Sequence, residues 1–126
     1  MNQKRFLAPQ IFNDESAESK LQRSKKISDL KNLGQVTERS LEAVKINTVK
    51  QFVKLGWKKT LVKLCESNHK NAHTIYAYAL IGALKNIEWN QISDVDKKEA
   101  QEFTFELRKK LKKKKNRLNV FKKFLI

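Results

Sequence analysis

Cysteine, proline and glycine are nearly absent from this chain, and each absence excludes a class of protein. One cysteine among 126 residues rules out a disulfide framework within the chain. One proline and three glycines leave no glycine-rich loop of the kind that cradles phosphates. No apolar run approaches the ~20 residues of a membrane span, and the start, MNQKRFLAPQ, lacks the apolar region of a signal peptide. We therefore expect one cytoplasmic domain without an export signal.

Acidic residues are also scarce. The chain has 13 Asp and Glu against 28 Lys and Arg, which gives a formal net charge of +15 at pH 7. Residues 107–126 contain ten Lys or Arg and no acid, so they carry +10 of that charge. A basic tail of this kind favours contact with a polyanion, and a solvated helix face that keeps the protein soluble is the alternative interpretation.

The longest apolar stretch, residues 71–93, predicts a buried central helix. Its apolar face is formed by two adjoining rows: Ile75, Ala79, Ala83 and Ile87 in one, and Tyr76, Leu80 and Leu84 in the other. A glycine inside a helix costs ~1 kcal/mol relative to alanine, so Gly82 and the small residues around it indicate close approach by a neighbouring helix.

Two Leu-Gly pairs, Leu33-Gly34 and Leu55-Gly56, predict turns with positive φ, which glycine adopts at little cost. Helices are therefore expected at about 35–45, 49–55 and 57–67, with Thr48 as the cap of the second. The residues expected to face inward are Val49, Phe52, Val53, Leu55, Trp57, Leu61, Leu64 and Cys65. Nearer the start, Asn13 or Asp14 is expected to cap a short helix through Leu21.

Ser93 begins the last helix with the capping signature S-D-V-D, and neither proline nor glycine follows it. Some thirty helical residues would span ~45 Å, which is longer than a domain of this size. The helix must therefore project, bend back or pack on another chain. Its apolar stripe consists of Val95, Phe103, Leu107, Leu111, Leu118, Phe121 and Leu125. The last five of these fit the seam of a homodimer, interrupted by Lys114.

Together these patterns predict an all-α fold, a small bundle of about five helices with a long basic C-terminal helix. We expect residues 1–26 to form a polar, partly disordered lead, residues 27–107 the helical domain and residues 108–126 a basic amphipathic extension.

A series of short motifs over about residues 27–107 resembles one known family. The motifs are Asn32-Leu33-Gly34, Ile46 to Val49, Leu55-Gly56, Tyr78-Ala79-Leu80, Gly82-Ala83-Leu84 and Trp89. They resemble the C-terminal domain of the TfoX family, bacterial proteins associated with the regulation of competence for DNA uptake. The polar lead stands where the family usually has an N-terminal α/β domain. The resemblance implies a bacterial regulatory protein with a fold similar to helix-hairpin-helix modules.

Helix-hairpin-helix modules hold the DNA backbone with the amides of a Gly-h-Gly turn, because adjacent exposed N–H groups at a helix N-terminus bind anions. Here Gly34 is followed by Gln35 and Val36, so the second glycine is absent. Leu55-Gly56-Trp57 lacks it as well, although Lys58 and Lys59 directly after it can reach a phosphate with their side chains. The resemblance therefore implies the fold more directly than it implies DNA contact.

Catalytic and metal-binding residues are not expected. Cys65, His69 and His73 have a spacing that would place them on one face of a continuous helix, but the turn-forming residues SNHKN between them predict a break. Cys65 lies on an apolar stripe without an adjacent base, which is unsuited to a nucleophile. Trp57 and Trp89 occur within apolar segments at helical spacing, which is typical of core residues rather than of base-stacking residues. We expect no enzyme activity and no cofactor.

Three functions remain open. The favoured one is a regulatory protein that binds an acidic partner, for example an enzyme that it inhibits, and that forms a homodimer through the long helix. The alternative is non-specific binding of nucleic acid, with steep salt dependence. Membrane-surface binding by the basic tail is a third hypothesis, and we consider it unlikely. The expected partner or phosphate contacts are Lys58, Lys59, Lys109, Lys112, Lys113 and Lys115, and the expected dimer seam is Leu107, Leu111, Leu118, Phe121 and Leu125.

Overall fold

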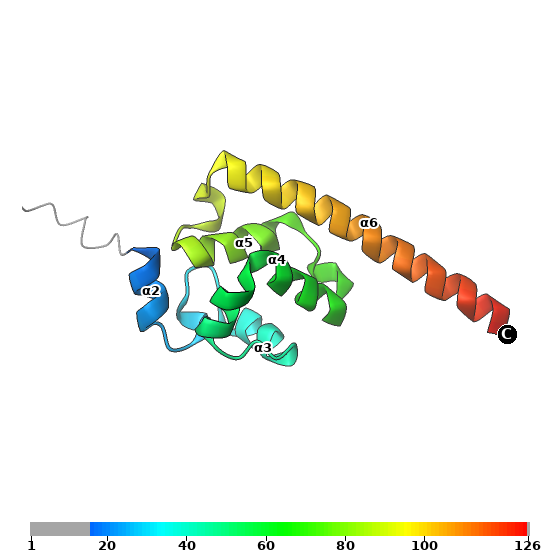
Figure 1. The fold of residues 1–126 in the computed structure, drawn as a ribbon, viewed down its shortest axis with the longest axis horizontal. Helices are drawn as coiled ribbons and strands as arrows, with labels where there is room; N and C mark the ends of the chain where they lie inside the picture. The colour runs from blue at the N-terminus through cyan, green and yellow to red at the C-terminus, as the bar shows by residue number, and fades with distance from the viewer. Residues whose placement is uncertain (1–15, 126) are drawn as a thin grey trace, which may run out of the picture.

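Five α-helices make up the part of the chain that the computed structural model describes, residues 16–125, with side chains as far as Lys115. They are α2 (Ala17–Arg23), α3 (Gln35–Ala43), α4 (Val49–Ser67), α5 (Thr74–Lys85) and α6 (Asp94–Leu125). Single 3₁₀ turns at Ile27–Asp29, His69–Asn71 and Trp89–Gln91 connect them. No strand occurs among these residues, so the predicted all-α fold is confirmed (Figure 1).

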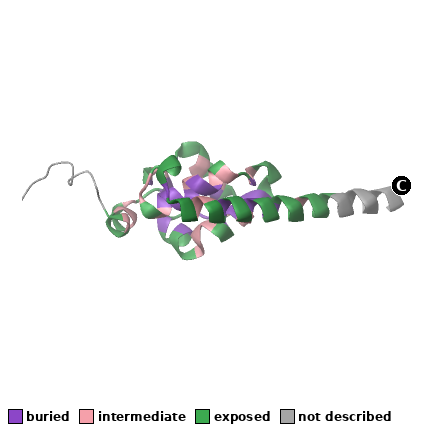
Figure 2. Ribbon diagram, turned by 90° about the horizontal axis from the view of Figure 1, so that it is seen from above, coloured by how far each residue is buried: buried purple, intermediate pink, exposed green. Residues whose placement is uncertain are grey.

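Helix α5 is the centre of the bundle, as predicted. It lies between α4 and α6 and buries six of its twelve residues, from Ala77 to Ala83 (Figures 1 and 2). One part of the predicted apolar face is wrong, because the Ile75 side chain is 49% exposed. The buried face is instead centred on Ala77, Leu80 and Ile81, because α4 and α6 cover the helix from two sides and leave its first turn open.

Gly82 lies at a point of close approach, but its neighbours are not those expected from the sequence. A Cβ atom at this position would collide with the Asn32 side-chain amide and the Ile87 carbonyl oxygen. Both belong to connecting segments, so the prediction that a neighbouring helix approaches Gly82 is wrong. The absence of a side chain makes room for the Asn32 amide, which donates a hydrogen bond to that carbonyl at 2.9 Å.

The two Leu-Gly pairs have different backbone conformations. Gly56 has φ 79° and ψ 170°, and it kinks α4 between the two helices that were predicted at 49–55 and 57–67. Gly34 has φ −116° and precedes the first turn of α3, so the positive φ predicted there is wrong. Asn32 has φ 71° instead. Asparagine tolerates this conformation, and here its side chain also bonds to distant backbone groups.

The helix caps follow the sequence closely. Thr48 Oγ1 accepts a hydrogen bond from the Gln51 N–H at 3.1 Å, and Gln51 bonds back to the Thr48 N–H. Ser93 Oγ accepts from the Asp96 N–H at 3.1 Å. Helix α2 is capped by Ser16, the residue directly before it, so the prediction of a cap at Asn13 or Asp14 is wrong.

Two valines expected to face the core are exposed. Val53 is 43% exposed and Val95 is 77% exposed. Val53 lies at the edge of the buried face of α4, next to the fully buried Phe52 and one turn after the buried Val49. At the start of α6 the first buried residue is Ala100, and Val95 points into solvent.

The core extends along the chain from Ile27 to Leu107, whereas α6 continues past it (Figures 1 and 2). Leu107 is only 8% exposed, and Leu111 packs against the same core. All of Lys112 to Lys115 are exposed. Of the three arrangements considered for the long helix, this chain shows projection. In the described part of the chain, no helix is both long and apolar enough to cross a membrane.

Candidate functional site

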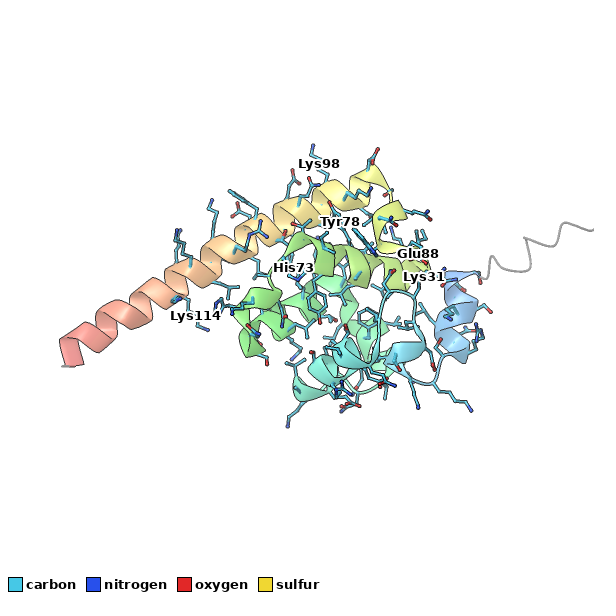
Figure 3. All side chains as sticks on the ribbon, turned by 180° about the vertical axis from the view of Figure 1, so that it is seen from behind. Lys31, His73, Tyr78, Glu88, Lys98 and Lys114 are labelled. Carbon is cyan, nitrogen blue, oxygen red and sulfur yellow. The ribbon has the colours of Figure 1, made fainter. Side chains whose placement is uncertain are left out.

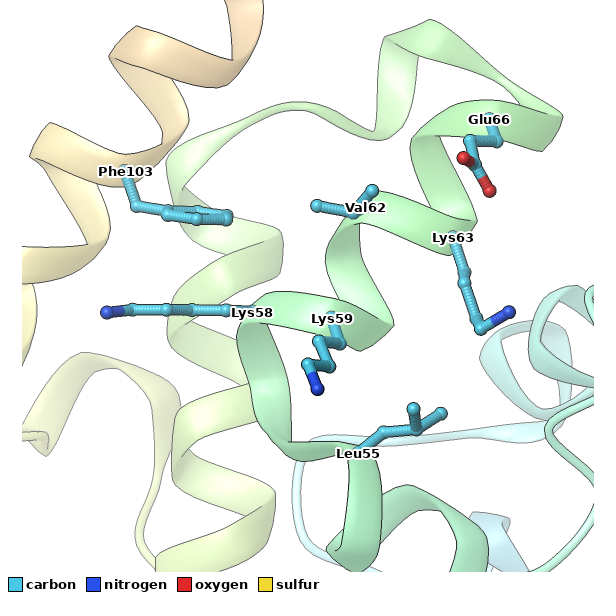
Figure 4. A pocket seen from close by; sticks show the side chains of 7 residues that line it. All are labelled: Leu55, Lys58, Lys59, Val62, Lys63, Glu66 and Phe103. Carbon is cyan, nitrogen blue, oxygen red and sulfur yellow. The ribbon is translucent and has the colours of Figure 1, made fainter.

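A groove lined by lysines lies between the second half of α4 and the first third of α6 (Figure 4). Its volume is about 400 Å³. We call it the lysine groove, and it is lined by Leu55, Lys58, Lys59, Val62, Lys63, Glu66 and Phe103. Three apolar side chains, Leu55, Val62 and Phe103, alternate with three ammonium groups, so the groove combines apolar surface with positive charge.

Lys58 is the most constrained of these lysines. Its ammonium lies 2.6 Å from a carboxylate oxygen of Glu99 on α6. The same ammonium lies 5.6 Å from the centre of the Trp57 ring and 5.8 Å from that of Phe103, distances at which a cation is attracted to an aromatic face. The two rings meet edge to face, with centroids 5.2 Å apart. Trp57 and Phe103 therefore hold α4 against α6 and fix the position of Lys58.

Lys59 and Lys63 are exposed and differ from Lys58 in their partners. They make no ion pair with any carboxylate within residues 16–115. They lie four residues apart on one face of α4, so their ammonium groups flank the same side of the groove. Glu66 is the only acid that lines it. An incoming carboxylate can therefore pair with either lysine without first displacing an internal ion pair.

The sequence prediction included two of these seven residues, Lys58 and Lys59, and the structure brings both to the groove. It missed Lys63, Glu66 and Phe103 as site residues. A signal for Lys63 was present, because Leu55, Lys59, Lys63 and Glu66 recur at helical spacing along one face. No sequence signal placed Phe103 opposite them, since its contact with α4 depends on how α6 packs.

A second basic surface surrounds α6 where it leaves the domain. We call it the lysine collar, and it consists of Lys109, Lys110, Lys112, Lys113, Lys114 and Lys115, all exposed. Six lysines within seven helical residues point to all sides of the helix, and Figure 3 shows Lys114 on the projecting part. Lys109 makes an ion pair with Glu106 at 3.6 Å and lies over the Phe105 ring. The sequence contains no acid after Glu106, so the collar's charge is largely uncompensated.

The predicted dimer seam is divided between two environments. Leu107 is buried in the core of its own domain and Leu111 packs against that core. The side chains of Leu118, Phe121 and Leu125 lie outside the described residues, although the helix backbone extends to Leu125. Leu107 and Leu111 are therefore already in contact with the core of their own chain.

In the hairpin between α3 and α4, the amides of residues 44–48 all donate within the chain. The N–H groups of Val44 and Ile46 donate to the Leu41 carbonyl, and that of Lys45 donates to Glu42. The next two amides, at 47 and 48, donate to the Gln51 side chain. These five amides are therefore not offered to a phosphate. At the other end of α3, after Gly34, the carboxylate of Glu38 lies in the first turn of the helix, where it repels an anion.

Cys65 and the two histidines are separated, as the turn residues between them predicted. Helix α4 ends at Ser67, and His73 caps α5, with its Nδ1 accepting from the Tyr76 N–H at 3.2 Å. Cys65 is buried, and burial raises the pKa of its thiol to about 11, so the thiolate needed for nucleophilic attack does not form near neutral pH. Within the described residues, no three His, Cys, Asp or Glu side chains are grouped closely enough to hold a metal ion.

The fold and these surfaces define a class, a small helical bundle with two basic surfaces, and comparison with known proteins gives the family. The sequence profile of the TfoX C-terminal domain matches residues 23–104. The chain therefore belongs to this family, which is related to the regulation of competence. The resemblance seen in the sequence is confirmed, and the profile begins and ends within a few residues of the buried core.

Among solved structures, the chain is similar to the crystal structure of an uncharacterized protein from Listeria monocytogenes, triclinic form. The two sequences are 28% identical, the TM-score is 0.62, and the match covers 65% of this chain and 92% of that one. No curated protein gave a significant match. The neighbour thus supports the fold, the family supports the fold and a regulatory class, and a partner has to be inferred from the surface.

Proposed function

We propose that this protein is a non-enzymatic regulatory binding protein that acts by contact with another protein. Its partner is acidic at the point of contact, and a carboxylate-bearing, partly apolar segment of the partner lies in the lysine groove. The observation that supports this is the groove itself, in which Leu55, Val62 and Phe103 alternate with lysines. Where the partner is an enzyme, occupation of its surface inhibits it.

The mixed lining of the groove favours a protein over a nucleic acid at this place. A phosphate backbone offers regularly spaced charge and little apolar surface, whereas a peptide segment presents both kinds of side chain within a few residues. Burying the apolar lining contributes about 25 cal/mol per Å². Lys59 and Lys63 then fix the orientation of the bound segment, because a carboxylate placed between them can accept hydrogen bonds from both ammonium groups.

The test is affinity capture from the native host with the complete protein as bait, compared with the variant Lys59→Gln/Lys63→Gln. The control Lys70→Gln/Lys98→Gln removes the same charge at exposed positions outside the groove. We expect the groove variant to lose a partner that the control retains and that survives nuclease treatment. Capture that is equal for both variants, or lost only with nuclease, contradicts the proposal.

The lysine collar supports a second candidate function, non-specific contact with nucleic acid. Six lysines on all sides of a projecting helix can meet a phosphate backbone in any orientation. Lysine is a solvated point charge that reads bases less well than arginine, so sequence preference is not expected. For duplex DNA, the logarithm of the affinity falls linearly with the logarithm of the salt concentration. Each phosphate that the protein neutralises makes this slope more negative by about 0.9.

Salt titration separates the two candidates. If the collar binds duplex DNA, changing Lys112, Lys113 and Lys115 to Gln makes the salt dependence shallower, by about 2 to 3 in slope. The same change should weaken binding equally for duplexes of unrelated sequence. Fluorescence anisotropy with two duplexes of different sequence measures both quantities. Binding that is absent at low salt for the unmodified protein eliminates this candidate.

A further inference from the structure

A second groove, lined by residues of α4 that precede those of the lysine groove, has no assigned role. It lies between α2 with its following turn and the first half of α4, and its volume is about 620 Å³. We call it the α2–α4 groove. It is lined by Leu21, Gln22, Ser24, Lys25, Thr48, Val49, Lys50, Val53 and Lys54.

The lining of the α2–α4 groove is apolar in the centre and positive at the edges. Leu21, Val49 and Val53 supply the apolar surface, and Val53 is 43% exposed although it lies in the middle of a helical segment. Lys25, Lys50 and Lys54 supply three ammonium groups, and no carboxylate lines the groove. None of the three makes an ion pair with an acid of the described residues. The matching ligand is a short segment with large apolar side chains next to acids.

We propose that this groove binds the chain's own N-terminal segment, Phe6–Glu15, with Ile11 and Phe12 against the apolar centre. The segment reads FLAPQIFNDE, so its second apolar pair is followed directly by Asp14 and Glu15. These two acids are the only ones before α2, and they complement the three unpaired lysines at the edges of the groove.

The covalent connection brings the segment within reach. It ends at Ser16, the cap of α2, and α2 itself lines the groove through Leu21 and Gln22. A seven-residue helix is about 10 Å long, and four extended residues span about 13 Å, so residues 11–14 can return along α2 to the groove. A short tether gives an effective concentration of about 1 mM, so an intrinsic Kd of about 0.1 mM is enough for about 90% occupancy.

Hydrogen exchange measured by mass spectrometry on the complete protein tests the proposal. Docking should slow exchange of the amides between Phe6 and Glu15 about tenfold relative to a synthetic peptide of the same sequence. Val53→Asp should abolish this protection, because it places a charge on the apolar centre. The control is Val36→Asp, the same change at an exposed valine on α3. Phe12→Ser should remove the protection without altering the groove.

Exchange at the peptide rate in the unmodified protein overturns the proposal, as does protection that survives Val53→Asp. Protection that rises with protein concentration also overturns it, since the occupant is then a segment of a second copy. The position of Phe12 in the groove is tested directly by disulfide formation in the double variant Phe12→Cys/Val53→Cys. The control is the double variant Phe12→Cys/Val36→Cys. We expect the first pair to close within one chain at least tenfold faster. The proposal is independent of the proposed function, because neither measurement requires a partner.

Discussion

Asn32 is the residue at which distant segments of the chain converge. Its side-chain amide donates to the carbonyl oxygens of Ile87 at 2.9 Å and Ala79 at 3.4 Å, and its Oδ1 accepts from the Trp89 N–H at 3.1 Å. Its own backbone has φ 71°. Gly82 leaves the space that this side chain fills. One asparagine thus joins the connection before α3 to both ends of the turn that follows α5.

Replacing Asn32 should therefore destabilise the domain through two separable effects. Asn32→Ala loses the hydrogen bonds and places at positive φ a residue that tolerates this conformation less well than asparagine, which together cost about 2 to 4 kcal/mol. Asn32→Gly loses the same bonds without the backbone strain, so it should be about 1 kcal/mol less destabilised. Urea unfolding of the three proteins measures both differences. Equal stability of the two variants would show that the backbone conformation contributes nothing.

Cys65 gives a pH dependence with a defined sign. Burial raises the pKa of its thiol from 9.0 to about 11, so the folded protein keeps the proton at a pH where the unfolded chain loses it. The stability that this thiol contributes is complete below pH 9 and falls as the pH rises from 9 to about 11. The free-energy difference between the protein and Cys65→Ala should decrease by on the order of 2 kcal/mol over this range. Urea unfolding at several pH values measures it, and a constant difference would contradict it.

At the scale of secondary-structure elements, the kink at Gly56 determines where the lysine groove lies. Leu55 precedes the kink, and the other α4 residues of the groove follow it. A straight α4 would direct its second half away from its present contact with α6 through Trp57 and Phe103. The φ of 79° and ψ of 170° at Gly56 belong to a region that only glycine enters readily.

Gly56→Ala should cost about 1 to 3 kcal/mol for this reason. No atom lies close to the position of the added methyl group, so the cost is one of backbone conformation and not of collision. Gly34→Ala is the matched control, because its surroundings are equally open and its φ is −116°. It should change the stability by no more than about 0.5 kcal/mol. Thermal or urea unfolding of both variants measures the two changes in stability. Equal changes would contradict the prediction.

At the scale of the whole molecule, the main feature is a helix that is longer than its domain. Helix α6 packs on the bundle as far as Leu111 and then continues to Leu125. Beyond the lysine collar the sequence contains Leu118, Phe121 and Leu125 at the spacing of a helical seam. Apolar residues at this spacing on a helix are typical of a seam between two helices, and we predict a symmetric homodimer formed through these residues.

The dimer prediction assigns self-association and partner binding to different residues of α6, so mutations can test each of them separately. Leu118→Asp with Phe121→Asp should give monomers, whereas changing Lys112, Lys113 and Lys115 to Gln should leave dimers intact and weaken capture of an anionic partner. Two lysine collars near each other repel, so dimerisation of the unmodified protein should strengthen as salt is added. Light scattering across protein and salt concentrations measures this. A monomer at high concentration in high salt would show that the prediction is wrong.

The sequence by itself determined the helical elements and most of their ends, because these depend on local chemistry. Thr48 and Ser93 cap whichever helix follows them, and Gly56 breaks a helix regardless of its neighbours. Motif spacing was also sufficient to identify the family. Only the tertiary structure decided which faces are covered: Ile75 and Val53 belong to apolar patterns and yet are exposed, because the elements around them leave these positions partly uncovered. It also decided that Asn32 and not Gly34 takes the positive φ, since the partners of Asn32 lie more than forty residues away. The lysine groove has the same origin, because local spacing aligns Lys59 with Lys63 but only the packing of α6 brings Phe103 opposite them.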